Sequence, residues 1–307
     1  MLGEEILFFP TSFFYFLIMH FLSPAKLNLF LQILGRREDD FHEIVTRYQA
    51  IAFGDQFSLS ISSRDSLQVI NACHLETPSN SIWKSVALFR RYTGITTPVS
   101  WRVVKQIPVG AGLAGGSSNA ATALFALNQI FKTGLSDEEM RSLAEQIGMD
   151  TPFFFSTGAA LGVARGEKII ALEESVSDRY VLYFSSEGVL TSRAFAAVQP
   201  SDCSSRKNLE YTQNDLEKPV FRLRLDLKEK KHWLESLWAE LPVHIGLTGS
   251  GATLFVRYPE ILEEDPSYAA QIQRAVTLSG GLLTSPIRRD PTASWYSIYS
   301  ESALAAT

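Results

Sequence analysis

The clearest alternating pattern of the chain lies between residues 25 and 33, where apolar side chains fall on every second position. The apolar set is Ala25, Leu27, Leu29, Leu31 and Ile33. This spacing predicts a β-strand, because successive side chains of a strand point to opposite faces of a sheet. Three polar side chains, Lys26, Asn28 and Gln32, are then expected together on the other face.

Short apolar runs and stretches of helical periodicity follow one another irregularly along the rest of the chain. We expect further strands at 45–62, with a turn at Gly54-Asp55, and at 67–70, 99–107, 180–185, 243–247, 252–258, 282–288 and 294–299. We expect helices at 80–92, 136–147, 230–241 and 267–278, and a further helix that begins at the glycine-rich segment 108–118. The helix at 136–147 starts with a capping box from Ser136 to Glu139. The helix at 230–241 carries a stripe that favours core packing over a ligand site, formed by Trp233, Leu234, Leu237, Trp238 and Leu241. Strands and helices mixed in this order are typical of an α+β fold.

The glycine-rich segment carries Gly110, Gly112, Gly115 and Gly116 and leads into an alanine-rich helix. Glycine allows a ligand to approach the main chain closely, and a helix start presents unpaired N–H groups and a positive dipole end. Together these features predict an anion site, usually for phosphate. A tight strand-to-helix turn explains a bare glycine loop about equally well. The segment has no Walker A lysine, and the acidic residues 137–138 fall at a helix start, which does not fit a dinucleotide fold.

The continuation Gly-Gly-Ser-Ser-Asn-Ala-Ala at 115–121 is more specific. With the preceding Pro-x-Gly-x-Gly-Leu it resembles the phosphate loop of the GHMP kinases. The segment Ser-Pro-Ala-Lys-Leu-Asn-Leu-Phe-Leu at 23–31 resembles their opening strand, and 247–255 resembles their third glycine motif. Asp-Phe-His at 40–42 and Gly-Met-Asp-Thr-Pro at 148–152 resemble the branch that phosphorylates the 2-hydroxyl of a cytidine diphosphate substrate in the non-mevalonate isoprenoid pathway.

This resemblance implies two lobes with the active site in the cleft between them. It places an ATP-binding domain at 22–165 and a substrate domain at 166–307, after an apolar extension at 1–21. It also implies an ATP-dependent, Mg²⁺-requiring kinase, with the nucleotide phosphates bound by the loop residues Pro108, Val109, Gly110, Ala111, Gly112, Leu113, Ala114, Gly115, Gly116, Ser117 and Ser118. The two serines are the hydroxyls expected to meet Mg²⁺.

The resemblance makes Asp150 the expected catalytic base and Lys26 its partner. By residue type alone, Asp150 is also typical of a turn or helix cap, Lys26 of a solvent-facing strand position and His42 of the surface. The residues expected to bind the acceptor are Asn28, Phe41, His42, Phe195, Gly249, Ser250 and Gly251. The family carries a tyrosine where this chain has Phe41, so stacking on a base is kept and a hydroxyl hydrogen bond is lost.

Two other functions stay open: a GHMP kinase of the homoserine or mevalonate type, and a non-catalytic ligand-binding protein on the same fold. The formal net charge of −5 argues against a broad nucleic-acid surface. The two cysteines, Cys73 and Cys203, are too few for a disulfide framework or a metal cluster and indicate reduced thiols in a cytoplasmic protein. The expected partners are therefore small molecules, and the expected state is a monomer or homodimer.

The apolar stretch at 6–22 is a poor targeting signal. Acidic Glu4 and Glu5 stand where a signal peptide would be positive, and Pro10 and His20 interrupt a run at the short limit for a membrane span. We expect translation to start at Met19, or a disordered extension, in preference to a membrane anchor.

Overall fold

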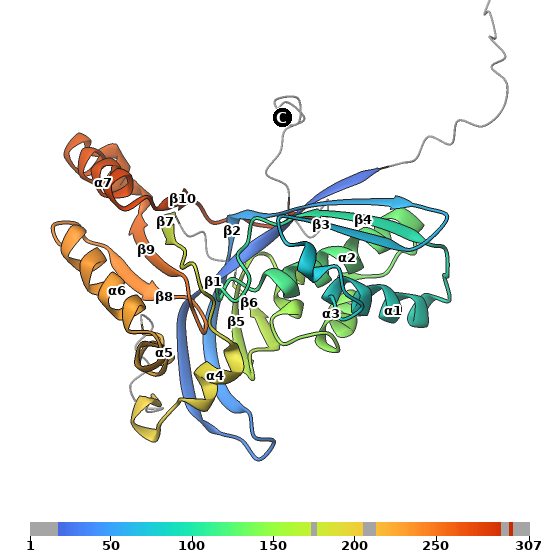
Figure 1. Cartoon of the computed structure of the whole chain (residues 1–307), viewed down its shortest axis with the longest axis horizontal. Helices are drawn as coiled ribbons and strands as arrows, with labels where there is room; N and C mark the ends of the chain where they lie inside the picture. The colour runs from blue at the N-terminus through green and yellow to red at the C-terminus, as the bar shows by residue number, and fades with distance from the viewer. Residues whose placement is uncertain (1–17, 173–176, 205–212, 290–294, 297–307) are drawn as a thin grey trace, which may run out of the picture.

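The computed structural model describes residues 18–172, 177–204, 213–289 and 295–296. Its elements form two groups (Figure 1). The N-terminal lobe contains β1–β6 and α1–α3, and the C-terminal lobe contains β7–β10 and α4–α7. The mixture of strands and helices confirms the predicted α+β class.

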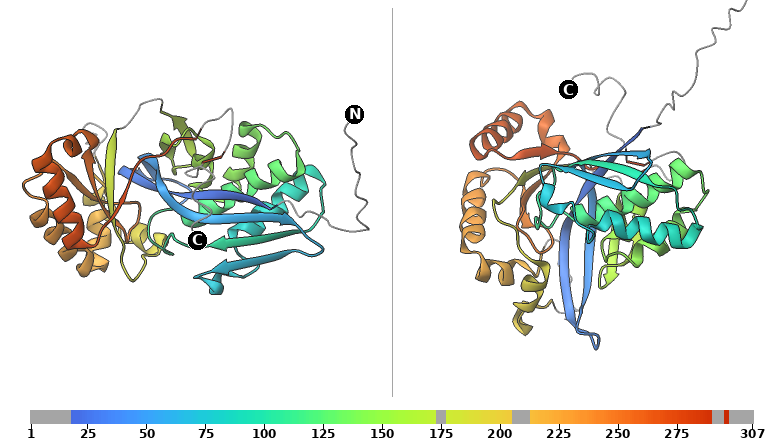
Figure 2. Two further views of the ribbon diagram at one scale, coloured as in Figure 1. Left: turned by 90° about the horizontal axis from the view of Figure 1, so that it is seen from above. Right: turned by 45° about the vertical axis from the view of Figure 1, so that its right-hand side comes forward.

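A long antiparallel hairpin, β1 (Met19–Arg36) with β2 (His42–Ile61), organises the N-terminal lobe. β2 also pairs with β4 (Val99–Val104) along its second half and with β5 (Ala159–Ala164) along its first half. The sheet edges are β3 (Ser66–Ile70) and β6 (Lys168–Ala171). The helices α1 (Ser81–Thr93), α2 (Gly115–Phe131) and α3 (Asp137–Glu145) cover one face of this sheet (Figure 2).

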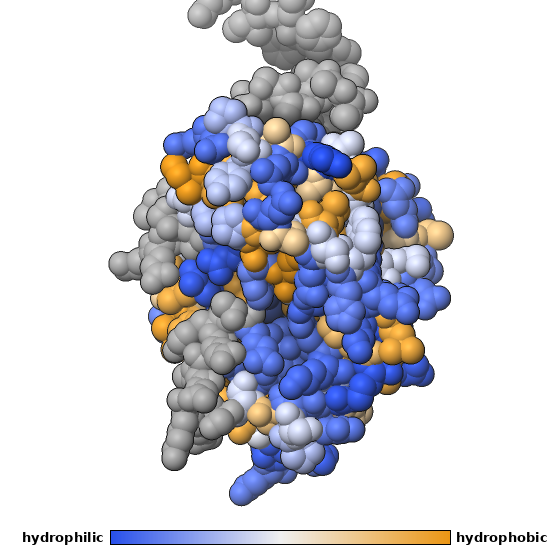
Figure 3. Space-filling view, turned by 90° about the vertical axis from the view of Figure 1, so that its left-hand side faces the viewer, coloured by the Kyte–Doolittle hydropathy of each residue, from blue (hydrophilic) through white to orange (hydrophobic). Residues whose placement is uncertain are grey.

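The C-terminal lobe is built on an antiparallel sheet of order β10-β7-β9-β8. Its strands are β7 (Asp178–Tyr183), β8 (His244–Leu247), β9 (Leu254–Pro259) and β10 (Leu282–Thr284). Its helices are α4 (Thr191–Ala196), α5 (Glu217–Leu223), α6 (Leu225–Leu237) and α7 (Pro266–Ser279). Single 3₁₀ turns elsewhere in the chain span Cys73–Leu75, Thr151–Phe155, Pro200–Asp202 and Glu260–Glu264. On the outer face of this lobe, apolar residues are scattered among polar ones (Figure 3).

The predicted alternation of the first strand is confirmed, but both of its faces are buried. Leu27 and Leu29 pack in a cluster that also holds Ile107 and Leu113 of the glycine loop and Tyr180 of β7. This cluster therefore joins β1 to both lobes. Two further clusters fill the lobes, one under α1–α3 and one under α5–α7.

The turn predicted at Gly54-Asp55 is wrong, because β2 runs through it without reversing. The pairing with β1 shifts register here, from Pro24 opposite Gly54 to Ala25 opposite Ile51. A Cβ at Gly54 would lie 2.3 Å from the Ser23 carbonyl oxygen, so the glycine is needed for close approach at a bulge.

The helix predicted at 230–241 begins earlier, at Leu225, and ends at Leu237. Leu234 and Trp238 are fully buried as expected, whereas Trp233 is 46% exposed and lies outside the core. Residue 233 is offset by 100° from residue 234, which places it at the margin of the buried face. The pattern also missed β5, β6, α4 and α5, and most of the strand expected at 294–299 lies outside the described residues.

The segment 285–289, together with Trp295 and Tyr296, returns to the N-terminal lobe and is called the C-terminal strap below. Its backbone forms two hydrogen bonds with β2. The Ile287 N–H donates to the Ala50 carbonyl over 3.0 Å, and the Ala52 N–H donates to the Ser285 carbonyl over 2.8 Å. Trp295 and Tyr296 are buried in the N-terminal core, and the Trp295 indole donates to the Leu22 carbonyl.

The predicted domain boundaries can be compared with the positions of the strands. Residues 19–21 belong to β1, while residues 1–17 of the expected extension lie outside the described residues. The division after residue 165 falls in the turn between β5 and β6, which pair with each other. We propose a boundary after Ala171 instead, with the C-terminal strap counted in the first lobe. None of the helices in the described ranges is both long and apolar enough to cross a membrane.

Candidate active site

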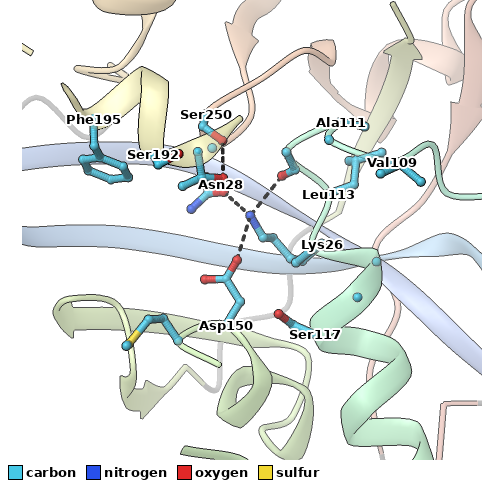
Figure 4. A pocket seen from close by; sticks show the side chains of 18 of the residues that line it. Lys26, Asn28, Val109, Ala111, Leu113, Ser117, Asp150, Ser192, Phe195 and Ser250 are labelled. Atoms are coloured by element: carbon cyan, nitrogen blue, oxygen red, sulfur yellow. Dashed lines mark hydrogen bonds and ion pairs between the residues drawn. The ribbon is translucent and has the colours of Figure 1, made fainter. Parts of the chain in front are cut away.

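A cavity of about 1130 Å³ lies where the two lobes meet. Its walls come from β1, β2, the glycine loop before α2, the segment around Asp150, α4 and the turn between β8 and β9. Every residue predicted for the site lines this cavity, except Ser118 and Gly251. Figure 4 shows side chains of these elements converging on the space around Lys26.

The glycine loop ends at Ala114, which is the N-cap of α2 in the left-handed conformation. The cap offers no side-chain hydrogen bond to the helix, so the first N–H groups of α2 are left for a ligand. Ser117, in the first turn of the helix, lines the cavity. Ser118 is fully buried, and its hydroxyl accepts a 2.8 Å hydrogen bond from Ser23.

The glycine loop lies directly against the loop between β8 and β9. Gly112 has φ +74°, and a Cβ there would lie 2.2 Å from the Thr248 carbonyl oxygen. The Thr253 N–H donates to the Ala111 carbonyl over 3.2 Å. The two glycine motifs, far apart in sequence, therefore form one continuous wall.

Lys26 projects from β1 into this wall and is 3% exposed. Its ammonium donates to Asn28 Oδ1 (2.5 Å) and to the Gly112 carbonyl (3.0 Å), and it lies 3.5 Å from Asp150 Oδ2. Burial lowers the pKa of Lys26 below its usual range, while the Asp150 carboxylate opposes that change. Lys26 is thus a buried, partnered group rather than a solvent-facing strand residue.

Asp150 comes directly before the 3₁₀ turn Thr151–Phe155, but its side chain does not cap that turn. Its Oδ1 instead accepts a 2.9 Å hydrogen bond from the Tyr48 hydroxyl, and its side chain is 30% exposed. Asp150 thus occupies a turn and the N-cap position, as the alternative expected, but its carboxylate makes no capping hydrogen bond. One face of the carboxylate is held by Lys26 and Tyr48 while part of it stays open to the cavity.

Asn28 connects the two strands and the two lobes. Its side-chain amide donates to Thr46 Oγ1 over 2.7 Å, and its backbone N–H donates to Thr248 Oγ1 over 2.9 Å. This arrangement fixes the orientation of the Asn28 side chain. Its NH₂ group must point to Thr46, so its oxygen points to the Lys26 ammonium.

The aromatic residues expected for the acceptor gather at the far end of the cavity. The rings of His42 and Phe195 stack on each other, with centroids 5.3 Å apart and planes at 29°. Phe41 is 49% exposed and lies under the Arg165 guanidinium at 5.1 Å. Burial, and then the charge of Arg36, lower the pKa of His42 below its usual range, so its ring is neutral at pH 7.

Several wall residues escaped the sequence analysis: Tyr48, Lys105, Asn119, Arg165, Thr191 and Ser192. Lys105 forms an ion pair with the fully buried Asp55. Asp55 also accepts hydrogen bonds from the backbone N–H groups of Gln106 and Ile107, directly before the glycine loop. Period-two spacing puts Thr46 and Tyr48 on one face of β2, but only the register of the hairpin places that face beside Lys26.

Within the described ranges, no group of three or more His, Cys, Asp or Glu side chains is placed to hold a metal ion. A magnesium ion in a kinase needs no such cluster, because substrate phosphates and water fill most of its coordination positions.

Comparisons with known proteins agree with this geometry. Residues 80–158 match the family described as GHMP kinases N terminal domain. The chain is 99% identical over 289 residues to 4-diphosphocytidyl-2-C-methyl-D-erythritol kinase of Chlamydia trachomatis serovar L2, covering 94% of this chain and all of that one. It is 74% identical over 278 residues to the protein of the same name from Chlamydia muridarum, covering 91% and 98%.

Solved structures show the same fold. A crystal structure of 4-(cytidine 5'-diphospho)-2C-methyl-D-erythritol kinase superposes with a TM-score of 0.70 at 27% identity, over 87% of this chain and 99% of that one. Homoserine kinase from Cytophaga hutchinsonii superposes with a TM-score of 0.67 at 13% identity, over 93% and 98%.

Proposed function

The chain belongs to the GHMP kinase family, and we propose that it phosphorylates the 2-hydroxyl of 4-diphosphocytidyl-2-C-methyl-D-erythritol with ATP in the cavity between its lobes. The activity follows from relatives of 99% and 74% identity that carry this name. The observation that carries the location is the Lys26–Asp150 pair at the junction of the two glycine loops.

Phosphoryl transfer depends on position and charge more than on covalent chemistry. We place the ATP phosphates against residues 108–117, where the uncapped start of α2 supplies N–H donors and a positive dipole end. Asp150 accepts the proton of the attacking hydroxyl, because its carboxylate is held in place and partly open to the cavity. Lys26 pairs with that carboxylate over 3.5 Å and stabilises negative charge that develops on the transferred group.

The residues present fit a magnesium ion on the phosphates, since the Ser117 hydroxyl lines the cavity beside the start of α2. Ser118 is committed to Ser23, so we assign Ser117 alone of the two serines to this role. A bound magnesium ion would neutralise charge on the phosphate oxygens.

The acceptor is placed at the other end of the cavity. Asn28, Gly249 and Ser250 line this part of the cavity and face the polyol and phosphates of the acceptor, whereas Gly251 does not line it. We propose that cytosine takes the place of one ring of the His42–Phe195 stack, so that Phe195 stacks on the base and neutral His42 bonds its edge. Phe41 supports this end of the cavity together with Arg165.

We propose further that the enzyme works in the cytoplasm as a monomer or homodimer. Its two cysteines are free thiols, in keeping with a reducing compartment.

The test is ADP release with the cytidine diphosphate acceptor, homoserine and mevalonate, each offered separately with ATP and Mg²⁺. We expect turnover with the first alone. Turnover with homoserine or mevalonate at a comparable kcat/KM would reassign the substrate within the family, and no turnover with any acceptor would favour a ligand-binding protein.

A further inference from the structure

Tyr48 projects from β2 into the centre of the candidate site and is 2% exposed. It stands opposite Asn28 in the pairing of β1 with β2. Its hydroxyl donates to Asp150 Oδ1 over 2.9 Å, and its ring faces the Lys26 ammonium with 5.6 Å from Nζ to the centroid. Tyr48 therefore contacts both members of the pair that the proposed reaction uses.

The Tyr48 hydroxyl has a clear preference between two acceptors. Asp150 Oδ1 is at 2.9 Å, whereas the Gly166 carbonyl is at 3.5 Å, beyond the usual range of a hydrogen bond. Burial, and then the negative charge of Asp150, raise the pKa of Tyr48 well above its usual range. The phenol consequently stays protonated and remains a donor at every pH at which the enzyme is assayed.

Each oxygen of the Asp150 carboxylate thus has its own partner. Oδ1 receives the phenol and Oδ2 faces the Lys26 ammonium at 3.5 Å. The other charged groups near Tyr48 are Glu167 and Arg165 in the turn between β5 and β6, and these two pair with each other at 3.3 Å. Tyr48 and Lys26 are therefore the two groups that hold the Asp150 carboxylate directly.

We propose that Tyr48 is a positioning residue for phosphoryl transfer, which orients the Asp150 carboxylate and donates a hydrogen bond to its charged form. This proposal rests on the proposed function, because it needs Asp150 to act as the base. Tyr48 does not touch the reacting atoms. It holds Asp150 in one rotamer, with the carboxylate plane fixed between the phenol and the ammonium, so that the open side of the carboxylate faces the cavity.

The test uses Tyr48→Phe, which removes the hydroxyl and keeps the ring under Lys26. The matched control is Tyr258→Phe, because Tyr258 is also buried and its hydroxyl also donates to a carboxylate, Glu263, over 2.8 Å in the other lobe. Single-turnover rates are measured from pH 5 to 9 with ATP, Mg²⁺ and the cytidine diphosphate acceptor, so that product release does not mask the chemical step.

We expect Tyr48→Phe to lower the single-turnover rate at pH 7.5 about tenfold, since a hydrogen bond to a charged group is lost. Both KM values should stay within about twofold, because the Tyr48 hydroxyl is bonded to Asp150 and phenylalanine keeps the ring that lines the cavity. Tyr258→Phe should leave the single-turnover rate and both KM values unchanged.

A second comparison separates positioning from a general structural effect. In the Asp150→Asn background, Tyr48→Phe should change the residual rate by less than about twofold, because the two residues act through one group. Thermal unfolding and nucleotide titration of each variant establish that it is folded at the assay temperature.

Three results would overturn the proposal: an unchanged single-turnover rate in Tyr48→Phe, an equal loss in Tyr258→Phe, or a full tenfold loss on top of Asp150→Asn. Failure of the proposed function is a different result, since the wild-type chain would then show no turnover with this acceptor.

Discussion

Asp150→Asn is the most direct perturbation of the site, because it removes a charge and a proton acceptor while keeping the shape of the side chain. The amide oxygen can still accept the Tyr48 hydroxyl, so the turn at 151–155 should keep its position. What is lost is the negative partner of Lys26, 3.5 Å away, and the group that takes the hydroxyl proton.

The expected loss in kcat is about 10²–10⁴-fold, the usual contribution of a general base, or roughly 3–5 kcal/mol of barrier. A second effect adds to it at high pH. Asp150 opposes the lowering of the Lys26 pKa by burial, so its removal should lower that pKa further. Lys26 then loses its charge as the pH rises through the new pKa, and the residual rate of the variant should fall on the alkaline side before that of the wild type does.

The assay is single-turnover phosphoryl transfer together with nucleotide titration. ATP affinity should stay within about threefold, because the glycine loop is untouched. The control is Asp178→Asn, which breaks a partly buried ion pair with Arg257 (2.6 Å) in the C-terminal lobe, outside the lining of the cavity. A kcat for Asp150→Asn above about a tenth of the wild-type value would refute its role as base.

The remaining predictions concern the walls of the cavity and the C-terminal strap. Gly112→Ala should raise the KM of both substrates, because a Cβ would collide with the Thr248 carbonyl and push the two glycine loops apart. Steady-state kinetics with each substrate varied in turn tests this. A change confined to one KM would argue against a shared wall. Phe195→Ala should raise the acceptor KM roughly 5- to 150-fold and leave the ATP KM unchanged, since stacking on a base is worth about 1–3 kcal/mol. An effect on the ATP KM only would place the pyrimidine elsewhere. Arg289→Met should lower the free energy of unfolding by about 2 kcal/mol, because it removes the charged hydrogen bonds between the buried guanidinium and the partly exposed Asp137. An unchanged unfolding midpoint in denaturant would contradict this.

Local patterns were sufficient for much of the fold. The alternation around Lys26, the capping box at Ser136 and the glycine-rich entry to α2 each depend on residues close together in sequence, and each is confirmed. The prediction at Gly54 was wrong because Gly-Asp is also a turn signal, and only the approach of Ser23 from another strand distinguishes a bulge from a turn.

The site was predictable where a motif carried it. Lys26 and Asp150 lie in such motifs, and the structure brings them to 3.5 Å. Tyr48 lies in no motif that was singled out. Its place beside Asp150 depends on the register of the β1–β2 hairpin, which shifts near residues 24, 28 and 33. Because each shift changes which residues face each other, the alternating pattern of the sequence alone could not predict that Tyr48 stands opposite Asn28.

The C-terminal strap has a consequence for the order in which the protein is made. The core under α1–α3 includes Trp295, which stacks on Phe125 at 4.7 Å, and the strap occupies backbone groups of β2 at Ala50 and Ala52. During synthesis the N-terminal lobe therefore emerges from the ribosome well before the residues that complete its core. Part of its apolar surface stays uncovered until then, so ribosome stalling or proteolysis near residue 285 should yield a lobe that chaperones retain rather than an independently folded fragment.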